Sequence, residues 1–152
     1  MAARLAAHRS LESRALALLA RREFSRAELR ARLFPHAQSE AEIEALLDGL
    51  VRRKLLSDQR FVESLVRRRA GRYGIARIRH DLSAHQLEPE QLRQVLQTLS
   101  ASEMERAREV WRKRFGEPAQ TREERLRQMR FLSARGFAAD VVRRVVTGAG
   151  ED

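Results

Sequence analysis

The 152-residue sequence contains no cysteine, which excludes a disulfide framework and any metal site with thiolate ligands. It has only seven glycines and three prolines, too few for the many tight turns of an all-β protein. Aromatic residues make up 5% of the chain, so a hydrophobic core must consist mainly of Leu, Val, Ile and Ala. No apolar run approaches the roughly 20 residues of a membrane span. These absences favour a helical protein.

The N-terminal residues 1–14 are rich in Ala and Arg but lack the apolar segment of a secretory signal. This composition is also typical of transit peptides. However, Leu11, Ala15, Leu18 and Leu19 fall at helical spacing and continue into the first domain helix. We therefore expect a cytoplasmic protein without membrane contact. We take it to be a monomer, although the sequence leaves the oligomeric state open.

Helical periodicity and helix start signals recur along the chain. Ile43, Leu46, Leu47, Leu50 and Val51 line one helix face, and no segment shows the alternation of a strand. Four capping boxes predict helix starts, at Ser25/Glu28, Ser39/Glu42, Ser100/Glu103 and Thr121/Glu124. Ser57 is expected to cap a helix and Pro89 to open one, and helices should end at Gly71, Gly116, Gly136 and Gly148.

The apolar frame repeats with a period close to 50 residues. Residues 82–87 (LSAHQL) match residues 132–137 (LSARGF), and the spacing of Leu92, Val95 and Leu96 returns at Val142, Val145 and Val146. The same frame occurs once more, 49 residues earlier. We expect an all-α fold in which three tandem three-helix, helix-turn-helix-like repeats, at 10–56, 57–101 and 102–148, form an elongated, gently curved array.

Positive charge is concentrated in the second and third of these predicted units. The net charge is +10 overall but only +1 over residues 1–50, against +6 over 51–102 and +5 over 103–150. This asymmetry indicates a polyanion or an acidic protein partner that contacts mainly the second and third units. Because 29 of the 31 basic residues are Arg, as a GC-rich genome favours, the preference for Arg is itself weak evidence of phosphate recognition.

Four stretches resemble the RecX family, which modulates the RecA recombinase: SRAEL (25–29), LSDQRF (56–61), RYGIARI (72–78) and RFLSARGF (130–137). Together with their apolar frame they cover nearly the whole chain. The resemblance implies a tandem three-helix-repeat fold, binding in the helical groove of the RecA–DNA filament, and suppression of RecA activities. The chain departs from the family at Gln86, where members often have Gly. If that turn requires a positive φ, Gln costs about 1 kcal/mol there.

The strongest candidate binding surface runs from the end of one helix into the next. Its residues are Arg67, Arg68, Arg69, Arg72, Tyr73, Arg77 and Arg79. Only Glu63 and Asp81 offer nearby compensation, whereas a solvated helix face normally alternates in sign. Arg pairs with carboxylate or phosphate through two parallel hydrogen bonds, and Tyr73 could stack or donate one. A plain solvated face remains the alternative.

A second candidate set consists of Arg108, Arg112, Lys113 and Arg114. Arg108 and Arg112 are like charges four residues apart, which suggests a partner, but Glu109 and Lys113 form a favourable pair. Some of Arg125, Arg127, Arg130, Arg135, Arg143 and Arg144 could extend this surface. Trp111, Phe61 and Phe137 are expected to pack in the core.

The sequence carries no recognisable catalytic, metal-binding or nucleotide-binding arrangement. His8, His36, His80 and His85 lack metal-ligand spacing, and no glycine-rich phosphate loop is present. We expect a non-enzymatic regulator without cofactors that binds RecA–DNA filaments, with single- or double-stranded DNA as a further contact of the basic face. A stand-alone helix-turn-helix-type DNA-binding module is the alternative, and a purely structural helical scaffold is a third possibility.

Overall fold

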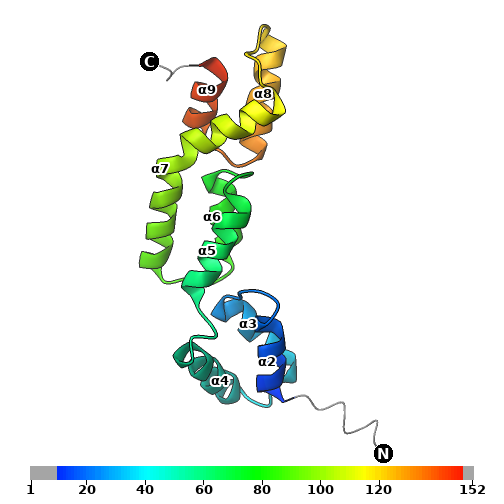
Figure 1. Cartoon of the computed structure of the whole chain (residues 1–152), viewed down its shortest axis with the longest axis vertical. Helices are drawn as coiled ribbons and strands as arrows, with labels where there is room; N and C mark the ends of the chain where they lie inside the picture. The colour runs from blue at the N-terminus through cyan, green and yellow to red at the C-terminus, as the bar shows by residue number, and fades with distance from the viewer. Residues whose placement is uncertain (1–9, 149–152) are drawn as a thin grey trace, which may run out of the picture. The chain divides into compact units, whose positions relative to one another are not determined.

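The computed structural model describes residues 10–148, and the secondary structure of that range is entirely helical (Figure 1). The helices are α2 (Leu11–Leu19), α3 (Arg26–Leu33), the 3-10 helix η1 (Phe34–His36), α4 (Glu40–Arg52), α5 (Asp58–Arg69), α6 (Ile75–Ser83), α7 (Pro89–Arg114), α8 (Arg122–Ala134) and α9 (Ala139–Thr147). The predicted all-α fold is confirmed.

The chain divides into two compact units, residues 1–64 and 65–152. Unit 1 is described from residue 10 and contains α2, α3, η1, α4 and the first part of α5. Unit 2 is described to residue 148 and contains the end of α5 and helices α6 to α9. The unit boundary therefore falls within α5.

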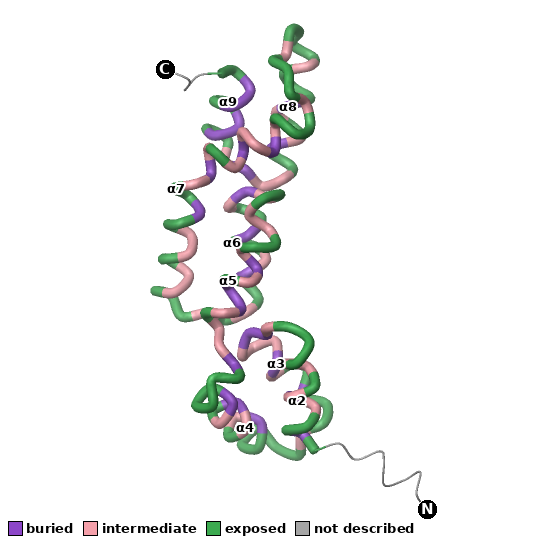
Figure 2. The backbone as a smooth tube through the Cα atoms, in the orientation of Figure 1, coloured by how far each residue is buried: buried purple, intermediate pink, exposed green. Residues whose placement is uncertain are grey.

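Unit 1 is built around one core cluster, aliphatic except for the ring of Phe24. Figure 2 shows where buried positions lie along the backbone. Its buried side chains come from α2, α3, α4 and the segments that follow them: Leu11, Ala15, Phe24, Leu29, Leu33, Ile43, Leu47, Leu50 and Leu56. The predicted stripe on α4 supplies three of these residues, while Val51 at its edge is exposed. Burial of an aliphatic side chain contributes about 1.5–3 kcal/mol, so this core is the main stabilising element of the unit.

The side-chain caps account for where several helices begin. Ser25 Oγ accepts a hydrogen bond from Glu28 N (3.1 Å), and Ser39 Oγ accepts one from Glu42 N (3.1 Å). Thr121 Oγ1 caps α8 by accepting from Glu124 N (3.1 Å), and Ser57 Oγ accepts from Arg60 N at the start of α5 (3.2 Å). These side chains satisfy backbone donors that have no partner inside the helix, as their spacing predicts.

The helix start predicted at Ser100 is wrong, because no helix begins there. Instead α7 runs without interruption over 26 residues, and Ser100 lies exposed in its middle. Leu99, Glu103, Ala107 and Val110 are buried along one face of the helix, so tertiary packing continues through the segment. A capping box is a local pattern, and here the packing of this face overrides it.

Helix ends and turns use left-handed backbone where the sequence predicts it. Gly116, Gly136 and Gly148 have φ values of +73°, +88° and +70°. Gln86, in the turn before α7, has φ +50°, so this turn does require a conformation that glycine adopts at lower cost.

Replacing Gln86 with Gly should therefore stabilise the protein. We expect Gln86→Gly to raise the free energy of unfolding by about 0.5 kcal/mol, because relief of the Cβ strain outweighs the added freedom of the unfolded chain. Gln97→Gly is the matched control, since Gln97 lies within α7, where glycine should cost about 1 kcal/mol. Urea unfolding of both variants tests the prediction, and equal destabilisation would contradict it.

Candidate binding surface

The four family-like stretches meet in pairs, one pair in each unit. In unit 1, the backbone N–H of Arg26 in SRAEL donates to Asp58 Oδ1 in LSDQRF (2.8 Å). Arg26 opens α3 and Asp58 opens α5, so this carboxylate ties the starts of two helices together. A carboxylate is also favourable at a helix N-terminus, because it faces the positive end of the helix dipole. These two stretches therefore have a structural role.

In unit 2, RYGIARI and RFLSARGF are joined through their backbones. Gly74 N donates to Arg135 O (2.8 Å), and Ala76 N donates to Gly136 O (3.1 Å). A Cβ on Gly74 would lie 2.3 Å from Phe137 N and 2.4 Å from Gly136 C and O. This approach is possible only because position 74 has no side chain. The backbone before α6 is thereby fixed against the turn between α8 and α9.

A buried carboxylate from α7 caps both neighbouring helices at this junction. Glu103 is 4% exposed, and its Oε1 accepts from Ile75 N (3.1 Å) and from Ala138 N (3.2 Å). Ile75 is the first residue of α6, and Ala138 is the N-cap of α9. Neither helix has a side-chain cap of its own. Glu103 therefore serves two helix N-termini at once.

Arg106, one turn further along α7, fixes the α5–α6 connection. Its guanidinium donates to the carbonyls of Ala70 (3.0 Å), Tyr73 (2.8 Å) and Leu99 (2.9 Å). Desolvation lowers the pKa of Arg106, and the charge of Glu103 partly offsets this effect. Arg106 is thus a positioning residue that holds Tyr73 and the turn around it.

A row of alternating arginine and aromatic side chains lies at this junction. The guanidinium carbons of Arg69, Arg77 and Arg135 lie 5.4, 5.1 and 5.4 Å from the centre of the Tyr73 ring. The guanidinium carbon of Arg135 also lies 5.1 Å from the centre of the Phe131 ring, and that of Arg114 lies 5.5 Å from the same ring centre. We call these six residues the arginine–aromatic row. Cation–π attraction holds the guanidinium groups in place while their edges stay available for hydrogen bonds.

The row borders a basic hollow of about 320 Å³, here called hollow A. It is lined by Gly71, Arg72, Val110, Lys113, Arg114, Phe131 and Arg135. Four of these side chains are cationic and none is acidic. The structure thus brings Arg72, from the first predicted set, together with Lys113 and Arg114 from the second.

Hollow B, of about 410 Å³, lies in the same unit and contains the other half of the second set. It is lined by Arg108, Trp111, Arg112, Pro118, Ala119, Arg125, Arg144, Val145, Val146, Thr147 and Gly148. Trp111 packs against the core of unit 2, as predicted, but is only partly buried. Its Nε1 donates to Oε1 of the buried Gln128 (2.9 Å). Arg112 pairs with Glu109 (2.7 Å), and Lys113 Nζ lies 3.9 Å from the same carboxylate.

The remaining members of the first set are less closely assembled. Arg67, Arg68 and Arg79 are exposed and line neither hollow. Asp81 compensates part of the row, since it lies 4.0 Å from Arg69 and 3.5 Å from Arg77.

Phe131 was not among the predicted site residues, although its ring links Arg114 and Arg135. Its signal was its place in the RFLSARGF stretch, one helical turn before Arg135. The sequence named Arg125, Arg135 and Arg144 only within a larger set of six arginines. In the structure Arg135 lines hollow A, and Arg125 and Arg144 line hollow B. Phe61 and Phe137 are buried, as expected.

Between residues 10 and 148, no three His, Asp or Glu side chains gather in a way that could hold a metal ion. No helix in that range is both long and apolar enough to span a membrane. His8, one of the four histidines considered, lies outside the described residues.

Comparison with known proteins identifies the family. The family model for the second three-helix domain of RecX matches residues 57–96, and that for the third matches residues 101–146. The chain is 51% identical to the regulatory protein RecX of Ralstonia pickettii over 93% of its length and 89% of the relative's. It is 53% identical to that of Ralstonia nicotianae, covering 92% of this chain and 88% of the relative.

A solved structure agrees in fold. The crystal structure of RecX from Lactobacillus salivarius superimposes with a TM-score of 0.75 and covers 91% of this chain and 93% of that one, at 19% sequence identity. The class defined by these matches is that of helical proteins built from RecX three-helix domains. The chain belongs to the RecX family, whose members named here are regulatory proteins.

Proposed function

We propose that this protein binds RecA–DNA filaments and inhibits or modulates the ATPase, recombinase and co-protease activities of RecA in DNA repair and the SOS response. It acts by binding in the cytoplasm, not as an enzyme. In this proposal residues 10–56, 57–101 and 102–148 are three repeats of one design, and hollow A with the arginine–aromatic row is the main contact.

Hollow A is the single observation that carries the choice of contact surface. Four cationic side chains converge there and no carboxylate lines the hollow. Lys113 is partly compensated by Glu109, 3.9 Å away, so it is mainly the charge of Arg72, Arg114 and Arg135 that remains available to an anionic partner. A filament of protein on DNA presents both acidic side chains and phosphates, and Arg pairs with either through two hydrogen bonds. Association should therefore weaken as salt rises.

Charge reversal in hollow A tests this proposal. We expect Arg72→Glu/Arg114→Glu to raise the protein concentration needed for half-inhibition of the DNA-dependent ATPase of RecA by about tenfold, because two attractive contacts become repulsive. Arg127→Glu/Arg143→Glu is the matched control, since both residues are exposed and line neither hollow. Circular dichroism should show that both variants remain helical.

The outcomes separate the alternatives. No effect of the unmodified protein on RecA at any ratio would overturn the function, whereas equal loss in both variants would remove hollow A from the contact. Capture of the protein on RecA assembled on single-stranded DNA should exceed capture on RecA or DNA alone. Tight binding to free duplex with a base preference would instead favour the helix-turn-helix-type DNA-binding module.

A further inference from the structure

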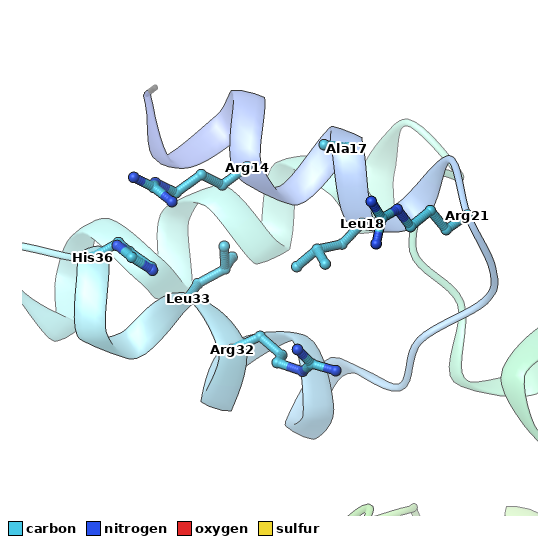
Figure 3. Close-up of a pocket in the computed structure, with 7 residues that line it drawn as sticks. All are labelled: Arg14, Ala17, Leu18, Arg21, Arg32, Leu33 and His36. Carbon is cyan, nitrogen blue, oxygen red and sulfur yellow. The ribbon is translucent and has the colours of Figure 1, made fainter. Parts of the chain in front are cut away.

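Unit 1 contains a third basic hollow, although residues 1–50 carry a net charge of only +1. The hollow has a volume of about 250 Å³ and is lined by Arg14, Ala17, Leu18, Arg21, Arg32, Leu33 and His36 (Figure 3). Arg14 and Arg21 come from α2 and the turn after it, while Arg32 and His36 come from α3 and η1 on the opposite side. Leu18 and Leu33 lie between them. No carboxylate lines it.

The acidic residues between positions 10 and 50 of unit 1 are all engaged elsewhere. Each of the seven acidic residues between positions 10 and 50 has a hydrogen-bond partner away from the hollow. The pairs are Glu12–Arg53, Glu23–Arg60, Glu28–Arg22, Glu40–Arg30, Glu42–Gln38 N, Glu44–Arg26 and Asp48–Arg26. Hydrogen bonds from Arg26 and then Arg30 lower the pKa of Glu44.

The arginines of the hollow have no counter-ion among residues 10–148. The side chains of Arg14, Arg21 and Arg32 form no hydrogen bond or ion pair with any residue in the described range. Like charges that share a concave surface repel one another, and the repulsion is relieved when an anion binds between them. The fold therefore gathers three guanidinium groups around one space and directs every nearby acid away from it.

We propose that this hollow is a phosphate site that holds the backbone of single-stranded nucleic acid. Guanidinium groups on two facing walls offer more donors than the two oxygens of one carboxylate can accept, whereas a sugar–phosphate chain provides acceptor oxygens along its length. No Phe, Tyr or Trp lines the hollow, so its polar contacts should go to the sugar–phosphate backbone. Because phosphate contacts carry no sequence information, binding should be independent of base sequence. The proposal concerns a different unit from hollow A and does not depend on RecA.

Binding of fluorescein-labelled 20-nucleotide oligo(dT) to the full chain, without RecA, tests the proposal. We expect Arg21→Gln/Arg32→Gln to weaken binding about tenfold and to reduce the steepness of its salt dependence by about 1.4, the value for loss of two phosphate contacts on a single strand. Arg52→Gln/Arg127→Gln is the control with the same change of charge at exposed positions outside the hollow. Oligo(U) should behave like oligo(dT), because the contact is to phosphate.

A local readout complements the affinities. The NMR signals of the His36 ring should shift when oligo(dT) is added to the unmodified protein and should shift less in Arg21→Gln/Arg32→Gln. The proposal would be overturned if the control variant weakened binding as much as Arg21→Gln/Arg32→Gln, or if neither variant weakened it. It would also be overturned if the His36 ring signals did not shift when the oligonucleotide was added. Poly-glutamate that competes better than oligo(dT) would assign the hollow to an acidic protein and would also overturn it. Since RecA is absent, none of these results bears on the function proposed above.

Discussion

Gly74→Ala should destabilise unit 2 by about 3 kcal/mol. The added Cβ would lie 2.3–2.4 Å from three backbone atoms of Gly136 and Phe137, and backbone cannot rotate away as a flexible side chain can. The two segments must separate, which breaks or lengthens the hydrogen bonds Gly74 N–Arg135 O and Ala76 N–Gly136 O. Overpacking typically costs about 1–3 kcal/mol, and each weakened hydrogen bond adds about 0.5–1.5 kcal/mol.

Gly71→Ala is the control for this prediction. A Cβ at position 71 would meet nothing within 4 Å, so its effect should stay within about 0.5 kcal/mol. Urea unfolding of the full chain, followed by circular dichroism, measures both variants. A Gly74→Ala protein with an unchanged midpoint would show that the two segments are not held as closely as the structure indicates. Inhibition of RecA should also fall in Gly74→Ala, because Arg135 belongs to hollow A.

Removal of the Glu103 side chain should have a comparable effect. Glu103→Ala leaves the backbone N–H groups of Ile75 and Ala138 without their acceptor, and a buried unsatisfied donor costs about 1–3 kcal/mol. It also opens a cavity beside Ala107 and removes the negative charge at two helix N-termini. We expect a total loss of about 4 kcal/mol in the free energy of unfolding.

Glu103→Gln separates charge from hydrogen bonding. The amide oxygen can still accept from both backbone donors, so we expect a loss of only about 1–1.5 kcal/mol, due to the missing charge at the helix ends. Glu105→Ala, at an exposed position of the same helix, should have almost no effect. Unfolding of the three variants in urea decides the matter, and a Glu103→Ala midpoint equal to that of Glu105→Ala would refute the shared cap.

Features that depend on neighbouring residues in the sequence could be predicted. The caps at Ser25, Ser39 and Thr121 require only a hydroxyl and the next three residues, and the positive φ at Gln86 follows from its place in a repeated turn. The helix start predicted at Ser100 was wrong because it rested on such a local pattern alone. The capping pattern is present, but the buried face of α7 depends on tertiary packing, which the local pattern does not contain.

The distribution of charge could be predicted only as an average. Residues 1–50 carry a net charge of +1, and this sum led to the prediction that an anionic partner contacts mainly the second and third predicted units. The pairing of Arg53 with Glu12 spans 41 positions, and such tertiary pairs decide which cations remain unneutralised. In the same way, hollow A combines residues from α7, α8 and the α5–α6 turn, so the sequence could name Arg72 and Arg114 but could not show that they meet.

The continuity of α7 has a practical consequence for anyone who dissects or recombines these proteins. The family models for the second and third domains end at residue 96 and begin at residue 101, yet both positions lie inside one helix. A chimaera spliced in that interval would join two foreign half-helices whose buried faces were selected for different neighbours. An exchange of the third domain with a relative should therefore carry the whole of α7 with it, together with the stretch around Gly74 that it supports.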